Sequence, residues 1–264
     1  MPTAREEAIQ DCIEWLRTHE GFMMHSGVAY RDVDGNVGLY AVTALRAGEI
    51  LLVMPESAHF YVDNPRVDAR LRGMFAAARD LYAAAYGEEA RMLGLEVVQL
   101  QLLLLMQRDG SFWEKYVRTL PPDMSSIPVF WSDEELYNLR GTQAAAVIST
   151  IRSEVAENYT KVIQPALRSL APELQAPFFA LPPAEQEAAY RRAVAWLMSR
   201  AHDRRDGGAQ LTPLVDLGNG LPDGWTDARQ AVNVEFRDVA GCPWSTVSAM
   251  RDVAAGAELV ISYG

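Results

Sequence analysis

Hydrophobic residues along the chain change their spacing twice, and these changes separate two β-like ends from a helical middle. Apolar residues between positions 9 and 16 follow helical intervals, and Thr3 with Glu6 has the spacing of a capping box at the start of that helix. Residues 28–54 consist of short β-prone pieces separated by glycines. We therefore expect a lead-in helix followed by three or four small strands.

The middle of the chain, between about residues 65 and 200, has a helical pattern almost throughout. Its richest apolar run, at residues 97–106, contains two glutamines and is far shorter than the ~18 apolar residues that a membrane span needs. We interpret this run as a buried helix. The strand pattern then returns, at residues 231–236, 245–250 and 258–263.

The two β-rich ends are each too small to be stable alone, so we expect them to pair with one another. The pattern predicts an α+β fold, in which a β fold of short strands is interrupted by a large α-helical insertion. The expected parts are residues 1–56 with the N-terminal helix and the first strands, residues 57–195 as the insertion, and residues 196–264 as the C-terminal part of the β fold. A ligand site is expected where the two ends meet.

The composition is that of an ordinary globular protein, with 49% hydrophobic residues among 264. A formal net charge of −11 argues against a non-specific nucleic-acid binder, because neutralising phosphates requires clustered Lys and Arg. A basic protein partner suits this charge, although solubility alone also explains it. The sequence shows no secretory signal and no membrane span, which predicts a cytoplasmic location or one inside an organelle or the nucleus.

The cysteines and histidines do not indicate a metal site or a disulfide framework. Cys12 and Cys242 lie far apart and fit no zinc-binding spacing. His19, His25 and His59 also lack the spacing of metal ligands. We expect reduced thiols and no bound metal.

Four short stretches contain the residue types of a ligand site: NVGLYA at residues 36–41, MSRAH at 198–202, PLVDLGNG at 213–220 and AGAELVISYG at 255–264. Alone, a Gly-Leu pair after a turn is typical of a hairpin, and Asp-x-x-Asn in a glycine-rich loop is typical of an Asx-turn. In this order and at these separations, the stretches resemble SET-domain protein methyltransferases. The resemblance is to the branch that contains the Rubisco large-subunit lysine methyltransferases and the actin-histidine methyltransferases.

The resemblance covers nearly the whole chain, and its most specific part is GLYAVTALRAGEILLVMP at residues 38–55. The middle adds FWEKYVRTLP at 112–121, PVFWSDEEL at 128–136 and GTQ at 141–143, in the order of an insertion peculiar to that branch, called iSET. The resemblance therefore implies a SET β fold at the two ends and an iSET insertion between them. On physical grounds, the large apolar residues of FWEKYVRTLP are expected to be core contacts.

The resemblance also implies S-adenosylmethionine as the cofactor, with a defined set of residues around it. Val37 would offer backbone contacts to the methionine end of the cofactor, and Ser199 and Arg200 would lie against the same ligand. Asp216 would organise its loop, and Asn219 would hydrogen-bond the ligand.

Tyr263, in the terminal ISYG, is the candidate catalytic residue that the resemblance implies. Methyl transfer from a sulfonium is an in-line displacement, so the enzyme must supply alignment more than strong acid or base chemistry. A narrow apolar channel keeps the attacking amine unprotonated. A tyrosine ring suits such a channel, and its oxygen orients the amine or the methyl group.

His202 is the candidate substrate-binding residue. At this place lysine-directed relatives commonly carry an aromatic residue, and histidine-directed relatives carry a polar side chain. The ring would hydrogen-bond a substrate imidazole or titrate near neutral pH. The alternative is a solvent-facing residue that precedes a charged loop.

The implied function is N-methylation of a protein, at a lysine of a non-histone protein. Histidine is the alternative target, and a non-catalytic SET-like protein-binding module is the alternative class. Histidine is an alternative because the branch contains both lysine and histidine methyltransferases. The non-catalytic module is an alternative because the chain departs from the family pattern in three ways.

The first departure is Asn36, which stands in place of the first glycine of the turn and is a residue that tolerates left-handed backbone. The second is Gly220, a candidate cofactor contact, which replaces a histidine that acts partly through its backbone. Thirdly, the family continues past the tyrosine strand into a segment that closes the cofactor pocket. We therefore expect a truncated gene model, a fragment, or a site that is open or completed by a partner.

Overall fold

Contacts within the chain group it into two units in the computed structural model, which describes residues 3–33, 35–204, 207–221, 231–238 and 242–262. The first, called here the β unit, comprises residues 1–65, 109–120 and 200–264. The second, called the helical unit, comprises residues 66–108 and 121–199.

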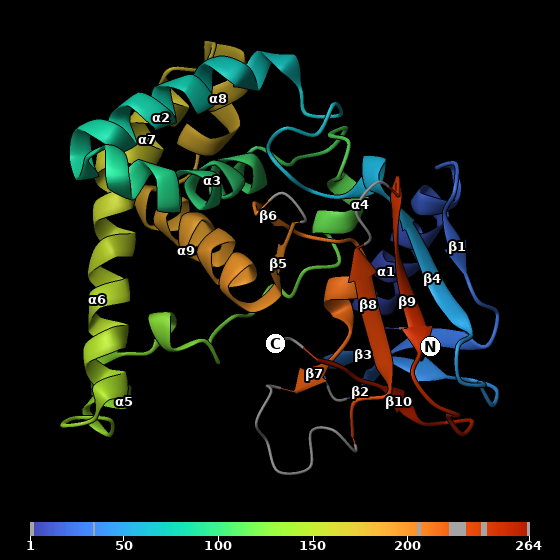
Figure 1. Cartoon of the computed structure of the whole chain (residues 1–264). Coiled ribbons are helices and arrows are strands. Elements are labelled where there is room, and N and C mark those ends of the chain that lie inside the picture. Colours follow the sequence, from blue (N-terminus) through green and yellow to red (C-terminus); the bar gives the residue numbers. More distant parts are fainter. Residues whose placement is uncertain (1–2, 34, 205–206, 222–230, 239–241, 263–264) are drawn as a thin grey trace. The chain divides into compact units, whose positions relative to one another are not determined.

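Strands from both ends of the chain pair in one antiparallel sheet of the β unit, as the sequence predicted. Its order is β1 (Met23–Met24), β4 (Ile50–Pro55), β9 (Trp244–Ala249) and β8 (Val234–Asp238). Figure 1 shows the blue and cyan strands of the N-terminal end lying beside the red and orange strands of the C-terminal end. Inward-facing Val247 and Ala249 are buried and alternate with half-buried neighbours, because successive strand residues point to opposite faces.

A second antiparallel sheet has the order β10 (Glu258–Leu259), β3 (Asn36–Ala41) and β2 (Val28–Val33). Gly35 forms the turn before β3 with a φ of 85°, a left-handed conformation that glycine adopts without strain. Asn36 is the first residue of β3 and has no positive φ. The left-handed backbone that Asn36 was expected to tolerate is therefore supplied by its neighbour.

Two short pairings complete the strands of the β unit. β11 (Ile261–Ser262) pairs in parallel with β7 (Gly220–Leu221), and β5 (His202–Asp203) pairs with β6 (Ala209–Gln210). Aliphatic side chains of both larger sheets form a single buried cluster. Its members include Leu39, Leu52, Val234, Val247, Leu259 and Ile261.

Helix α1 (Ala4–Arg17) begins with the predicted capping box, in which Thr3 and Glu6 satisfy each other's backbone N–H groups. Its buried residues are the predicted apolar stripe of Ile9, Cys12, Ile13 and Leu16. Short helix α4 (Glu114–Val117) also belongs to the β unit, together with the 3-10 turns η1 (Glu56–Ala58) and η5 (Val215–Leu217).

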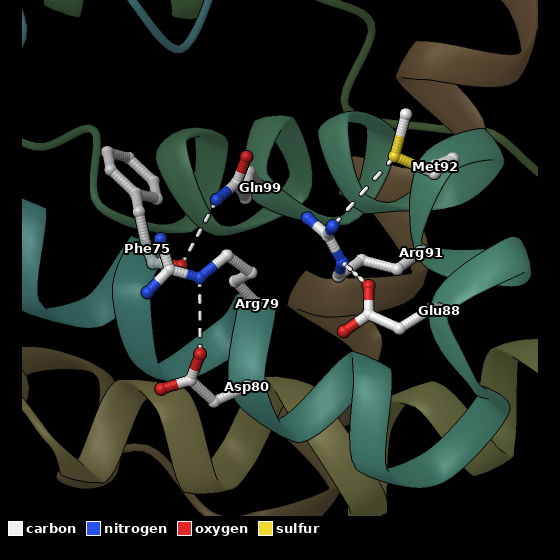
Figure 2. Close-up of polar contacts among 7 residues, drawn as sticks. All are labelled: Phe75, Arg79, Asp80, Glu88, Arg91, Met92 and Gln99. Carbon is white, nitrogen blue, oxygen red and sulfur yellow. Dashed lines mark hydrogen bonds and ion pairs between the residues drawn. The ribbon is translucent and has the colours of Figure 1, made fainter.

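The helical unit begins with η2 (Ala69–Leu71) and the helices α2 (Arg72–Tyr86) and α3 (Glu88–Leu105), which are joined at Gly87. Figure 2 shows the amide of Gln99 on α3 donating to the carbonyl oxygen of Phe75 on α2, at 3.1 Å. The end of α3 contains the predicted buried run, in which Leu100 and Leu102 are inaccessible to solvent. The sequence prediction of a buried helix there is confirmed.

The rest of the helical unit is also made of helices, with a π-helical turn at Tyr159–Ile163. The elements are η3 (Pro128–Phe130), α5 (Asp133–Tyr137), α6 (Gln143–Asn158), α7 (Gln164–Arg168), α8 (Pro172–Phe179) and α9 (Pro183–Arg200). Over the part of the chain that the structure describes, no helix combines the length and apolarity that a bilayer crossing needs.

Candidate functional site

The loop from Leu211 to Gly220 carries three of the predicted site residues and is fixed tightly in the β unit. Leu214 has a φ of 66°, the one positive value for a non-glycine residue in the described segments. Its carbonyl oxygen accepts a hydrogen bond of 2.8 Å from the hydroxyl of Tyr30 on β2. The residue with the unusual backbone conformation is therefore also held by a contact with a strand distant in the sequence.

Asp216, in this loop, is a buried carboxyl with only 1% of its surface exposed. The hydroxyl of Tyr116 donates to its Oδ2, while Oδ1 has no hydrogen-bond partner among the described residues. Burial raises the pKa of Asp216 to about 6, against the opposing effects of Arg200 and of the Tyr116 hydroxyl. Asp216 thus links its loop to the 109–120 segment. Its carboxyl changes between the protonated and the ionised form around pH 6.

Arg200, at the end of α9, reaches the same loop. Its guanidinium donates to the backbone carbonyl oxygen of Asp216. Two predicted cofactor contacts, Arg200 and Asp216, are therefore adjacent in the β unit. The buried carboxyl also contributes, after burial itself, to raising the pKa of the Cys12 thiol.

Asn219 lies against β3 and β10. Its amide nitrogen donates to the Oε1 of Glu258 at 2.5 Å. A Cβ placed on Gly38 would lie 2.5 Å from that oxygen and 2.9 Å from the Asn219 nitrogen, so a side chain at this position would collide with the pair. The structure therefore brings Asn219 next to the residue that follows Val37, as expected if both serve one ligand.

Gly220 is paired with Ile261 in the parallel β7–β11 ladder, and the N–H of Ile261 donates to the carbonyl of Asn219 at 3.0 Å. The backbone of the loop is thus hydrogen-bonded to the strand that precedes Tyr263. Tyr263 itself lies outside the described residues. Its catalytic role stays a prediction.

His202, on β5, lies beside Phe236, with ring centroids 5.2 Å apart. Burial, and secondarily the nearby His59, lowers the pKa of His202 to about 4. The ring is therefore neutral at pH 7, and the expectation that it titrates near neutral pH is wrong because the ring is largely withdrawn from solvent. A neutral imidazole keeps both a donor and an acceptor nitrogen.

His59 is hydrogen-bonded to residues near His202. Its Nδ1 lies 3.0 Å from the Oε1 of Gln210, and its Nε2 lies 3.0 Å from the hydroxyl of Ser245. Gln210 is the β6 residue that pairs with His202. A buried histidine bonded at both ring nitrogens is a structural residue, and no metal role follows from it.

Two other predicted cofactor contacts are less informative. Val37 is buried, with 3% of its surface exposed, so only its backbone is suited to meet a ligand. The hydroxyl of Ser199 donates to the carbonyl of Ala195 within α9, at 2.8 Å. The roles of Val37 and Ser199 toward the cofactor stay predictions.

Three functional candidates were missed in the sequence. Tyr116 was assigned to the core, and it is buried as expected, but its hydroxyl also holds Asp216. Glu258 lies inside the AGAELVISYG stretch, yet no local spacing rule connects it to Asn219, which lies 39 residues earlier. Gly38 was part of the recognised turn motif, which is the one available signal for a close backbone approach.

The chemistry around Asn219 suits the amino-acid end of a ligand. The amide of Asn219 and the carboxylate of Glu258 are half-buried, and the side-chain-free positions Gly38 and Gly218 flank them. Oxygen acceptors of this kind match an ammonium group. These acceptors therefore fit the ammonium group in the methionine portion of S-adenosylmethionine.

Comparisons with known proteins identify relatives at low sequence identity. No known family model matches the chain. An actin-histidine N-methyltransferase of Canis lupus familiaris is 26% identical over 277 residues, covering 98% of this chain and 41% of that protein. The human actin-histidine N-methyltransferase is 25% identical over 169 residues, covering 61% of this chain and 25% of the human one. The chain thus spans less than half the length of these relatives.

Solved structures give a clearer match. The SET domain of LSMT bound to lysine and AdoHcy superposes with a TM-score of 0.68 at 21% identity, covering 99% of this chain and 55% of that one. Rubisco LSMT bound to sinefungin and monomethyllysine gives a TM-score of 0.70 at 20% identity, covering 97% and 52%. The chain has the SET-domain fold, which confirms the fold expected from its ordered motifs.

Proposed function

We propose that this chain is the catalytic portion of an S-adenosylmethionine-dependent protein N-methyltransferase that acts on a lysine of a non-histone protein. The observation that carries the proposal is the meeting of Gly38, Asn219 and the strand before Tyr263 in one place in the β unit. Supporting it, the structures with the same fold hold AdoMet, AdoHcy, lysine or monomethyllysine.

When bound, S-adenosylmethionine supplies an electrophilic methyl group on a sulfonium. The residues of this chain must then hold the ligand and orient the acceptor nitrogen along the line of displacement. Asn219 and the backbone at Val37 and Gly38 bind the amino-acid end, and Arg200 holds the loop through the carbonyl of Asp216. The chemistry requires no strong base at the reacting centre, because desolvation of the acceptor amine favours its neutral form.

Tyr263 follows β11 directly after Ser262 and is proposed to orient the acceptor amine. Its hydroxyl would act on the reacting centre and not on the remote end of the cofactor. We expect Tyr263→Phe to lower the rate of methyl transfer strongly and to leave cofactor affinity nearly unchanged. Equal rates for the two proteins would remove Tyr263 from the catalytic role.

Histidine is the second candidate acceptor. It is favoured by the actin-histidine relatives and by the neutral ring of His202, which can donate or accept a hydrogen bond to an imidazole. The two targets therefore differ in the modified residue, which can be measured directly.

The experiment that tests the function is transfer of a radioactive methyl group from S-adenosylmethionine to proteins of a lysate from a strain in which this gene is deleted. We expect a labelled protein band with the wild-type chain and a much weaker one with Tyr263→Phe in the same reaction time. Mass spectrometry of the labelled peptide then identifies the residue. Methyl-histidine would overturn the lysine assignment, and no labelling by either the chain or a longer version of it would overturn the enzymatic function.

A further inference from the structure

Glu258 makes a short contact with a residue of the candidate cofactor site. Its Oε1 accepts the amide N–H of Asn219 at 2.5 Å. The pair is possible only because Gly38 has no side chain, since a Cβ there would lie 2.5 Å from the same oxygen. Three segments far apart in sequence therefore contribute to one arrangement.

The backbone of Glu258 is held from two sides. Its β10 position pairs with Tyr40 on β3, and its carbonyl oxygen accepts the amide of Asn233 at 2.8 Å. The negative charge of Glu258 also contributes, after burial, to raising the pKa of the Tyr40 phenol. A carboxylate anchored in this way offers a fixed acceptor to Asn219.

An ionised carboxylate only accepts hydrogen bonds, whereas a carboxamide has one accepting and one donating end. The contact with Glu258 therefore fixes the orientation of the Asn219 side-chain amide. The nitrogen faces Glu258, and the oxygen Oδ1 faces away as an acceptor. An acceptor suits an ammonium group and does not suit a carboxylate.

We propose that Glu258 is a positioning residue for cofactor binding: it sets the amide of Asn219 so that Oδ1 accepts from the ammonium group of the amino-acid portion of the cofactor. This inference rests on the proposed function. It adds a residue that does not need to touch the ligand and acts through another side chain.

The test uses two ligands that differ in the amino-acid portion. S-adenosylhomocysteine carries it, and 5′-methylthioadenosine lacks it. In calorimetric titrations of Glu258→Met, which removes the oxygen that accepts from Asn219, we expect the affinity for S-adenosylhomocysteine to fall about tenfold, the order expected for losing one hydrogen bond to a charged group. The affinity for 5′-methylthioadenosine should not change. The matched control, Glu20→Met, makes the same substitution at an exposed helix-following residue and should leave both affinities at the wild-type value.

A purely structural role would weaken both ligands alike, and that result would overturn the proposal. A second arm repeats the comparison in an Asn219→Ala background, where Glu258→Met should have little further effect on S-adenosylhomocysteine. An undiminished loss there would show that Glu258 does not act through Asn219.

A ligand-free measurement separates this inference from the proposed function. In NMR spectra of the protein alone, the side-chain amide protons of Asn219 should shift in Glu258→Met and stay in place in Glu20→Met. Unchanged Asn219 signals in both variants would overturn the positioning contact itself. If the Glu258 variant shows the shift but the wild-type protein binds neither nucleoside, that result would instead contradict the proposed function and, with it, the ligand group assigned to Asn219.

Discussion

Replacing Asp216 with asparagine tests the electrostatics of the buried loop most sharply. The variant keeps an oxygen to accept the Tyr116 hydroxyl and keeps the backbone carbonyl that accepts from Arg200. It removes the ability to ionise and puts an amide NH2 group where Oδ1 has no hydrogen-bond partner in the part of the chain that the structure describes, a change whose cost does not depend on pH. Any difference in pH dependence between the two proteins therefore belongs to this one carboxyl.

The size of the effect follows from the pKa of Asp216, which burial raises from 3.8 to about 6. Each unit of pKa difference corresponds to about 1.4 kcal/mol, so ionising this carboxyl costs about 3 kcal/mol more in the folded protein than in the unfolded one. Because the folded-state pKa is the higher one, the folded protein binds the proton more tightly between pH 4 and pH 6. The free energy of unfolding therefore has its full contribution from protonated Asp216 below about pH 4. It loses that contribution as the pH rises from about 4 to about 6, and above pH 6 the loss is complete.

The assay is urea unfolding of both proteins at several pH values between 4 and 7.5, with the free energy of unfolding compared at each pH. Asp216→Asn should gain stability relative to the wild-type protein as the pH rises, by about 3 kcal/mol across this range. A constant difference would refute the reasoning. A change of opposite sign would show that Arg200 and Tyr116 lower the pKa of the carboxyl more than burial raises it.

Three further predictions concern single residues. Gly38→Ala should weaken S-adenosylhomocysteine binding and lower the free energy of unfolding by about 1–3 kcal/mol, because its Cβ would collide with Glu258; calorimetry and urea unfolding measure the two effects, and a fully wild-type variant would contradict the close approach. His202 should titrate near pH 4 in an NMR pH series of the imidazole signals, since burial lowers its pKa; a midpoint near 6.5 would place the ring in solvent. Cys12 is inaccessible and burial raises the pKa of its thiol, so iodoacetamide at pH 7.5 should modify half-buried Cys242 first; peptide mapping that shows equal rates would argue against this burial.

Much of the β unit was predictable because its signals are local. The capping box at Thr3 and the strands on either side of Gly35 follow from spacing within a few residues. Pairing of the two β-rich ends followed from their small size, since neither end has enough strands to be stable alone.

The polar contacts of the site were not predictable in the same way. Tyr116 and Asp216 lie 100 residues apart, and no local pattern indicates that a core tyrosine will donate to a loop carboxyl. The pair of Asn219 and Glu258 depends on how β3, β10 and the loop meet, which is a property of the tertiary structure. The low pKa of His202 has the same origin, because the burial that causes it is set by Phe236 and the β5–β6 pairing.

Binding of S-adenosylmethionine is the measurement that tests the central claim most directly. Calorimetric titration of the purified chain should give saturable heat with a stoichiometry of about one, as expected for a single ligand site. Asn219→Ala should weaken that binding, because the amide is proposed to contact the amino-acid end of the ligand. Absence of heat from both the chain and a longer version of it would contradict the assignment of this SET fold to a methyltransferase.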